Sequence, residues 1–315
     1  MRLLVLGALA ILLAPSARSP APGCTPHPGL GSVTLARGEV VDLATCHVRT
    51  VHVRTPAGLV APGGAVATVR ATGSRRTLRS TIWVTQPGGA SHAVFSAKVW
   101  GDTAGRDSNG PIELLGFSDD ARWVFFAIDP GSSSSIAADG LLLQVVSAAG
   151  GRPHRLGIML PYRDYLTWCG RRLVFTAGED RIAIHAKRLL TAAPPAWRPR
   201  PLVEQPGESF GSLACDGDSV IVQSQPSSTD AGFFATRWAL WKVGLDGSHR
   251  ALTAPARRST DESPLVTRDG QTVLFVRSHS GHGELYALRN GHAIGPLLSL
   301  GFQLGFYGHR NWWAP

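Results

Sequence analysis

One pentapeptide of this 315-residue chain has the spacing of a catalytic serine motif. Residues 207–211 read Gly-Glu-Ser-Phe-Gly, and in serine hydrolases the pattern Gly-x-Ser-x-Gly exposes a nucleophile on a sharp turn between a strand and a helix. The residues that follow, 213–222, predict a turn and a β-strand, so the helix that this turn needs is missing. We therefore expect Ser209 to lie in a connection between two β units and not to act as a nucleophile.

His279, His282 and Glu284 form a second candidate, the string His-x-x-His-x-Glu. Imidazole and carboxylate groups are common ligands of divalent metals. This string lies in a Ser- and Gly-rich segment without helical spacing, whereas metal ligands are usually held by a rigid frame. The pattern favours a solvated hairpin loop, and we predict neither a metal site nor a cofactor.

The four cysteines, Cys24, Cys46, Cys169 and Cys215, are an even number and include no Cys-x-x-Cys pair. Their spacing argues against a redox or zinc site and favours disulfides, which are typical of exported proteins. Three pairings are possible. Cys169 and Cys215 occupy equivalent turns of successive repeats, described below, which predicts a bridge between them and leaves Cys24 for Cys46.

The composition excludes several classes of protein. Hydrophobic residues make up 43% of the chain, which argues against global disorder, and the high Gly and Pro content favours short strands joined by turns. The net charge of +9 attracts anionic partners in general. The arginines are scattered in short pairs such as Arg257-Arg258, however, whereas nucleic-acid-binding proteins cluster their charge. We expect a solvated surface and no specific nucleic acid.

The N-terminus has the pattern of a secretory signal. Arg2 precedes an apolar run over residues 3–13, and small residues follow it. We predict a signal peptide over residues 1–21, a short linker over 22–29, and no transmembrane span, because a span needs about 20 apolar residues. Acylation of Cys24 in a lipoprotein is the alternative to a disulfide there, but the leucine expected before the small residues is lacking.

One short pattern, an apolar residue, a turn and a strand, occurs five times, at intervals of 45–57 residues. The second strand of a copy is often followed by a hairpin with a tight turn, as at Asp246-Gly247 and Asn290-Gly291. These intervals are near the 40–50 residues of propeller blades, so each copy predicts one antiparallel blade. The turns of the five copies contain Pro62 and Gly63, Asp119 and Asp120, Gly170, Asp216 and Gly217, and Asp269 and Gly270.

The two ends of the chain predict how the ring closes. Residues 311–315 look like the start of another copy, and residues 31–35 and 39–43 supply a strand, a turn and a strand. A sixth blade built from both termini would protect the sheet edges, with His309 packed at the closure. The prediction is an all-β, six-bladed β-propeller of four-stranded blades over residues 30–315; five or seven blades are the alternatives.

The repeats resemble the Trp-Ser-Pro-Asp-Gly repeats of TolB-type propellers, which are WD40-like (PD40) repeats. The best matches are residues 267–271, Thr-Arg-Asp-Gly-Gln, and residues 117–121, Phe-Ser-Asp-Asp-Ala, although no copy carries the full motif. The resemblance covers the chain from about residue 30 onward. It implies the propeller fold and binding of other molecules in a central funnel. The separate N-terminal domain of TolB has no counterpart here, so the partners of TolB do not transfer.

Sialidases are propellers too, but their Asp-box turn places the aspartate two residues before the glycine, whereas Asp269 and Gly270 are adjacent. Sialidases also need an arginine triad and a tyrosine nucleophile. No such constellation is recognisable around the tyrosines, which are Tyr162, Tyr165, Tyr286 and Tyr307. Most tryptophans are expected to fill the core between blades, namely Trp83, Trp123, Trp168, Trp238 and Trp241.

These patterns predict an exported, non-catalytic propeller that binds a protein, glycan or cell-envelope component at its funnel. We expect a monomer, secreted or associated with the cell envelope. The alternative is an extracellular hydrolase or lyase acting on carbohydrate or peptide, with a site assembled from separate blades. Loops 102–110 and 131–139 are long enough for recognition, and equally for tolerated insertions.

Overall fold

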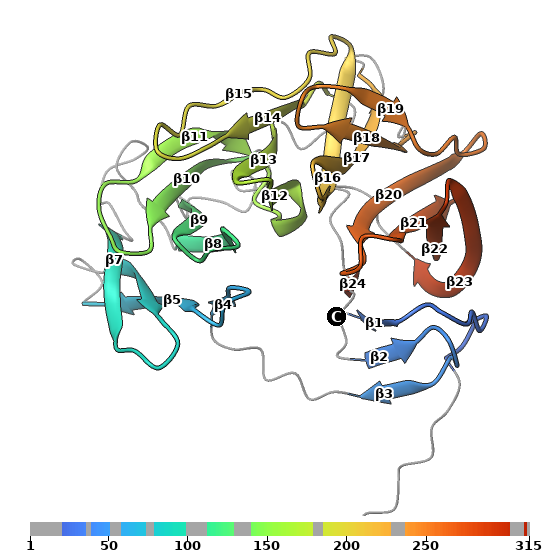
Figure 1. Cartoon of the computed structure of the whole chain (residues 1–315), viewed down its shortest axis with the longest axis horizontal. Coiled ribbons are helices and arrows are strands. Elements are labelled where there is room, and N and C mark those ends of the chain that lie inside the picture. Colours follow the sequence, from blue (N-terminus) through green and yellow to red (C-terminus); the bar gives the residue numbers. More distant parts are fainter. Residues whose placement is uncertain are drawn as a thin grey trace, which may run out of the picture.

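The structure is a computed structural model that describes residues 21–35, 39–50, 58–73, 79–98, 112–128, 140–178, 185–227, 237–302 and 312–313. Loops 102–110 and 131–139, Tyr307, His309 and all but the last residue of the predicted signal peptide lie outside the described residues. The described strands form six four-stranded antiparallel sheets. These blades follow one another around a ring (Figure 1).

Each blade is a meander numbered here by its place in the chain. Blade 1 contains β24 (Trp312–Trp313), β1 (Ser32–Leu35), β2 (Glu39–Asp42) and β3 (Val48–Thr50). Blade 2 contains β4 (Leu59–Val60), β5 (Val66–Thr72), β6 (Arg79–Thr85) and β7 (Ser91–Lys98), and blade 3 contains β8 (Ile112–Phe117), β9 (Trp123–Ile128), β10 (Leu141–Ser147) and β11 (His154–Met159). Blade 4 contains β12 (Leu166–Cys169), β13 (Arg172–Ala177), β14 (Arg188–Ala192) and β15 (Arg200–Pro201). Blade 5 contains β16 (Glu208–Asp216), β17 (Ser219–Pro226), β18 (Ala239–Gly244) and β19 (His249–Ala251), and blade 6 contains β20 (Ser259–Val266), β21 (Val273–His279), β22 (His282–Arg289) and β23 (His292–Phe302).

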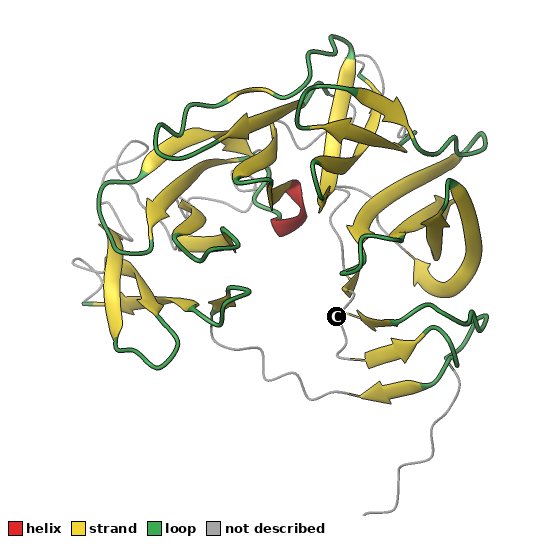
Figure 2. Cartoon of the chain, in the orientation of Figure 1, coloured by secondary structure: helices red, strands yellow, loops and turns green. Residues whose placement is uncertain are grey.

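A single 3-10 turn, η1 (Arg163–Tyr165), is the helical element of the described chain and was not predicted from the sequence. It leads directly into β12 and lies on the inner side of the ring (Figure 2). No helix among the described residues is long and apolar enough to cross a membrane.

The repeated turns connect the first and second strands of blades 2 to 6, as the sequence predicted. In blade 3 the Asp120 carboxylate accepts hydrogen bonds from the Ser118 hydroxyl (2.5 Å) and the Arg122 amide (3.1 Å). In blade 6 the Asp269 carboxylate accepts the same two bonds, from the Thr267 hydroxyl (2.6 Å) and the Gln271 amide (3.0 Å). The aspartate of the repeat is therefore a turn-forming residue, because its carboxylate satisfies the backbone amide of a tight turn.

Buried apolar side chains join five pairs of neighbouring blades in the described part of the chain. Ile82 packs in one cluster with Phe126 between blades 2 and 3, Phe125 with Phe175 between blades 3 and 4, and Val174 with Val222 between blades 4 and 5. Leu240 and Phe275 share a cluster between blades 5 and 6, and Leu285 and Val41 share one between blades 6 and 1. Burying one such side chain stabilises the fold by about 1.5–3 kcal/mol, so the ring is held mainly by these contacts. Trp83, one of the five tryptophans predicted to fill the core between blades, lies outside these clusters, and the guanidinium of Arg70 lies 5.1 Å from its ring centre.

The termini close the ring as predicted. β24 pairs with β1 through Thr34 with Trp313 and Leu35 with Trp312. The six-bladed propeller is therefore confirmed.

The segment predicted as a short linker, 22–29, is attached to two blades by hydrogen bonds. The amide of Thr25 donates to the carbonyl of Leu297 in β23 (2.9 Å), and the amide of His27 donates to that of Leu43 after β2 (2.8 Å). The Cys24–Cys46 disulfide bonds the same segment to blade 1. The segment therefore connects blades 6 and 1, the two blades between which the ring closes.

Candidate functional site

Ser209, the serine of the elbow-like pattern, lies inside strand β16 and not in a connection between blades, which corrects the predicted location. It is 0% exposed, and its hydroxyl donates a hydrogen bond to the carbonyl of His185 (2.8 Å). A nucleophile needs an accessible oxygen next to a base that takes its proton. Buried against a backbone carbonyl, Ser209 has the position of a structural residue.

The His-x-x-His-x-Glu string forms the end of a hairpin. His279 closes β21, His282 opens β22, and the two residues are paired across a two-residue turn. His279 Nδ1 lies 3.3 Å from the Ser259 hydroxyl, and Glu284 accepts a hydrogen bond from Tyr286 (3.4 Å). Within the described ranges, no group of three or more His, Cys, Asp or Glu side chains is placed to hold a metal ion.

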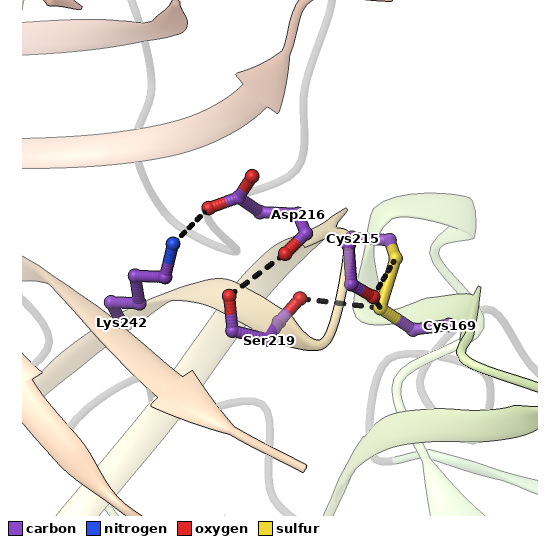
Figure 3. The surroundings of a disulfide bond; sticks show 6 residues. Cys169, Cys215, Asp216, Ser219 and Lys242 are labelled. Carbon is purple, nitrogen blue, oxygen red and sulfur yellow. Dashed lines mark hydrogen bonds and ion pairs between the residues drawn. A yellow bond between two sulfur atoms is a disulfide. The ribbon is translucent and has the colours of Figure 1, made fainter. Parts of the chain in front are cut away.

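Both disulfides join the predicted partners. Cys24 is bonded to Cys46 with the Cα atoms 5.7 Å apart, and Cys169 is bonded to Cys215 with the Cα atoms 5.4 Å apart. The second bridge connects the first turn of blade 4 to the first turn of blade 5 (Figure 3). A disulfide closing a loop of this size contributes about 2–4 kcal/mol, so it fixes how the two blades face each other.

A cleft of about 720 Å³ lies beside this disulfide and is lined by the predicted turn residues Gly170 and Asp216. Gly170 adopts φ +52°, and a Cβ atom there would come within 2.5 Å of the Leu245 side chain of blade 5. Glycine suits this position because it adopts the left-handed backbone conformation without strain and leaves room for the Leu245 side chain. The other lining residues come from blade 5, except Arg172, and are Asp218, Ser219, Lys242, Gly244, Leu245, Asp246, Ser248, His249 and Arg250.

The charges of this cleft, called here the interblade cleft, are arranged by short contacts. Lys242 Nζ lies 2.5 Å from Asp216 Oδ2, and the Ser219 hydroxyl donates to the backbone carbonyl of Asp216 (2.8 Å), as Figure 3 shows. The hydroxyl and the amide of Ser248 both donate to Asp246 and lower the pKa of its carboxyl. Asp246 is therefore a fixed negative charge at neutral pH, unsuited to donating a proton there.

Blade 6 holds a second polar group, on its first strand β20. Asp261 is 0% exposed and binds the Arg277 guanidinium through two hydrogen bonds of 2.7 and 2.8 Å. The adjacent Glu262 is buried as well and accepts a hydrogen bond from the Ser278 hydroxyl (2.5 Å). Burial raises the pKa of Glu262, the Ser278 hydrogen bond opposes this shift, and the Asp261 carboxylate adds to it.

Replacing Glu262 by Gln is expected to stabilise the protein more at pH 8 than at pH 4. Because the folded pKa of Glu262 lies above its ordinary value of 4.5, the contribution of this group to stability is full below pH 4.5 and is lost as the pH rises through the folded pKa. Gln keeps the shape of the neutral acid and does not titrate. Urea unfolding midpoints of both proteins between pH 4 and 8 would test this, with Glu204→Gln as the control for losing one exposed charge. A gap between the curves that stays constant or narrows toward pH 8 would contradict the assignment.

The sequence did not indicate the central role of Trp197. It is 2% exposed in the connection between β14 and β15, and its ring lies 5.0 Å from that of Trp123 and 6.0 Å from that of Phe125, both on blade 3. Sequence reasoning also missed the Lys242 ion pair. The spacing of the repeats does not indicate which side chains of one blade pair with each other across its strands. The hairpin turn at Asp246 and Gly247, in contrast, was predicted.

No protein-family model matches the chain, and no curated protein matches it in sequence. Solved structures similar to it include TolB from Acinetobacter baumannii (15% identity, TM-score 0.48, 86% of this chain and 63% of that one) and a TolB-type protein from Agrobacterium tumefaciens (14%, 0.48, 90% and 95%). Another is the acylaminoacyl peptidase of Pyrococcus horikoshii (13%, 0.48, 81% and 40%). The chain thus spans less than two thirds of the first TolB and of the peptidase. These likenesses concern the fold of those proteins alone, and the six-bladed propeller of this chain rests on its own strand pairing.

Proposed function

We propose that this chain is an exported, non-catalytic β-propeller that binds a peptide carrying both positive and negative charges, either in a protein partner or in a peptide-bearing cell-envelope glycan. The observation that carries the proposal is the interblade cleft, in which cations and carboxylates are set side by side on a disulfide-linked frame. The two disulfides support export, because disulfides persist in oxidising compartments.

The exposed charges of the cleft suit such a ligand. Asp218 and Arg250 are exposed, and their side chains form no ion pair with another described residue. Lys242 and Asp216 already neutralise each other, and Ser248 orients Asp246. Charges that are held in place lose little freedom when a ligand binds, which favours complementary recognition. The proposed binding position is therefore the junction of blades 4 and 5, whereas the sequence led us to expect the funnel.

Isothermal titration calorimetry of the full chain with a synthetic peptide of alternating Lys and Glu tests the proposal, with poly-Lys, poly-Glu and a soluble peptidoglycan fragment as further probes. The mixed-charge peptide or the fragment is expected to bind with a Kd on the order of micromolar. The double variant Asp218→Ala, Arg250→Ala should weaken this binding by about tenfold, which corresponds to about 1.4 kcal/mol.

The matched control is Glu204→Ala, Arg257→Ala, which also removes one acid and one base from exposed positions but does so outside the cleft. This variant should bind like the unmodified chain. Equal weakening by both variants, or tighter binding of either single-charge polymer, would rule the cleft out as the recognition site.

A catalytic role is the second candidate, and Glu262 is the observation that favours it. A carboxyl group whose pKa is raised by burial has the property of a general acid. The pKa of the nearby Tyr165 is raised as well, mainly by burial and to a smaller extent by Asp164, Tyr162 and Glu262. Glu262 is only 5% exposed, however, which leaves a substrate little access, so binding is the better-supported function. Mass spectrometry of the peptide and the fragment after incubation would reveal any cleavage.

A further inference from the structure

The positive charge of the chain is concentrated on one part of the ring, although the arginines look scattered along the sequence. Residues 141–203, from β10 to just past β15, contain ten basic and three acidic side chains, a net charge of +7 out of +9 for the whole chain. Lys187 and Asp164 are buried, and Arg181, Glu179 and Asp180 lie outside the described residues, which leaves eight basic side chains and no acidic one on the described surface of this region. The described surface of this region is therefore strongly basic.

A groove of about 420 Å³ lies within this surface, between β11 of blade 3 and β14–β15 of blade 4. Arg188 and Arg200 line it, and both are exposed. Neither guanidinium forms an ion pair with a carboxylate in the part of the chain that the structure describes. Arg155 and Arg198, in the strand and connection that flank it, are exposed as well. We call this feature the basic groove.

We propose that the basic groove binds a linear polyanion of phosphodiesters joined by small polyols, as a second ligand that holds the propeller on an anionic envelope polymer. Guanidinium groups bind phosphate oxygens in a bidentate manner. Arg188 and Arg200 open neighbouring antiparallel strands, and Arg200 pairs with Thr191, three residues along β14 from Arg188. Three residues span roughly 10 Å at about 3.3 Å per residue, and because side chains alternate between the two faces of a strand, Arg188 and Arg200 leave blade 4 on opposite faces at its outer edge. A ligand that contacts both guanidinium groups must cross this edge, which an extended polyanion can do and a single phosphate cannot.

The remaining lining distinguishes this ligand from other polyanions. Apart from the two arginines, the described lining residues are glycine, alanine, proline, leucine and isoleucine. No aromatic ring is among them on which a nucleic-acid base could stack. The amide of Gly178 already donates to the carbonyl of Ile158 (2.9 Å), so the edge of β11 is partly occupied and does not favour addition of an acidic peptide strand.

Fluorescence anisotropy with a labelled glycerol phosphate oligomer at low salt tests this proposal on the full chain. Arg188→Ala, Arg200→Ala should weaken binding by about tenfold or more and reduce the slope of log Kd against log salt by about one to two. The control, Arg257→Ala, Arg258→Ala, removes the same charge from exposed positions between blades 5 and 6 and should weaken binding by less than about threefold. Circular dichroism and thermal melting confirm that each variant is folded.

Comparison probes identify the class of ligand. Poly-Glu, oligothymidylate and vesicles containing an anionic lipid should all bind more weakly than the glycerol phosphate oligomer. The proposal is overturned if any of them binds as tightly, if both arginine pairs weaken binding equally, or if the oligomer does not bind at low salt. Because the peptide test uses the interblade cleft, failure in one experiment leaves the other result intact.

Discussion

Replacing Asp261 by Ala is expected to lower the free energy of unfolding by about 3–5 kcal/mol, because it leaves the Arg277 guanidinium without its anion. The Asp261 side chain is 0% exposed and that of Arg277 26%, and the two residues face each other on β20 and β21. The guanidinium also lies 4.9 Å from the ring centre of Tyr286, so the loss of Asp261 leaves it beside an aromatic ring and without a carboxylate.

Urea unfolding under oxidising conditions measures this loss. The matched control is Lys242→Met, which breaks the Lys242–Asp216 pair, where the lysine is 36% exposed. An exposed pair contributes at most about 1 kcal/mol, so the control should lose much less stability. Asp261→Leu combined with Arg277→Met removes both charges and should recover much of the loss. If Asp261→Ala destabilises no more than Lys242→Met, the buried pair does not hold β20 in place.

The features that the sequence predicted correctly depend on local geometry. A tight turn needs particular residues at particular positions, so the matching bonds of Asp120 and Asp269 appear in the sequence as a repeated pattern. The Cys169–Cys215 bridge follows from the same repeat, because equivalent turns of adjacent blades lie close together. The turn residues of the interblade cleft were therefore found, but the cations that face them were not.

The first strands of blades 5 and 6 could not be identified from their sequences. β20 begins Ser-Thr-Asp-Glu-Ser and β16 begins Glu-Ser-Phe-Gly-Ser, and both resemble polar loops. Alternation of apolar and polar residues predicts strands that have one face in water. Both strands instead bury polar side chains, such as Ser212 and Asp261, and both contain a bulge that breaks the alternation. The burial of Ser209 and Glu262 follows from this arrangement.

Contacts between blades were equally hidden. Trp197 follows two prolines and an alanine in a connection, where an aromatic side chain has no periodicity to place it. Its burial depends on the position of blade 3, which is far away in the sequence. The same holds for the basic groove, whose arginines are distant from β11 along the chain and adjacent to it only in the ring.

Replacing Trp197 by Ala is expected to lower the free energy of unfolding by about 3–5 kcal/mol, because it leaves a cavity in the core between blades 3 and 4. The indole ring contacts Trp123 and Phe125 of blade 3 and Trp168 of blade 4 at 5.0, 6.0 and 6.2 Å between ring centres. Trp197→Phe keeps an aromatic ring there and removes an indole N–H that has no hydrogen-bond partner among the described residues, so it should lose less stability.

The loss should also be local. Pro199 and Arg200, which line the basic groove, lie two and three residues after Trp197, so Trp197→Ala is expected to speed amide hydrogen exchange in β11 and β14 more than in β22. Mass spectrometry of hydrogen exchange together with urea unfolding measures both effects. Uniform acceleration through all blades would show that Trp197 stabilises the whole ring equally, whereas acceleration confined to blades 3 and 4 identifies it as the residue that holds the two walls of the basic groove together.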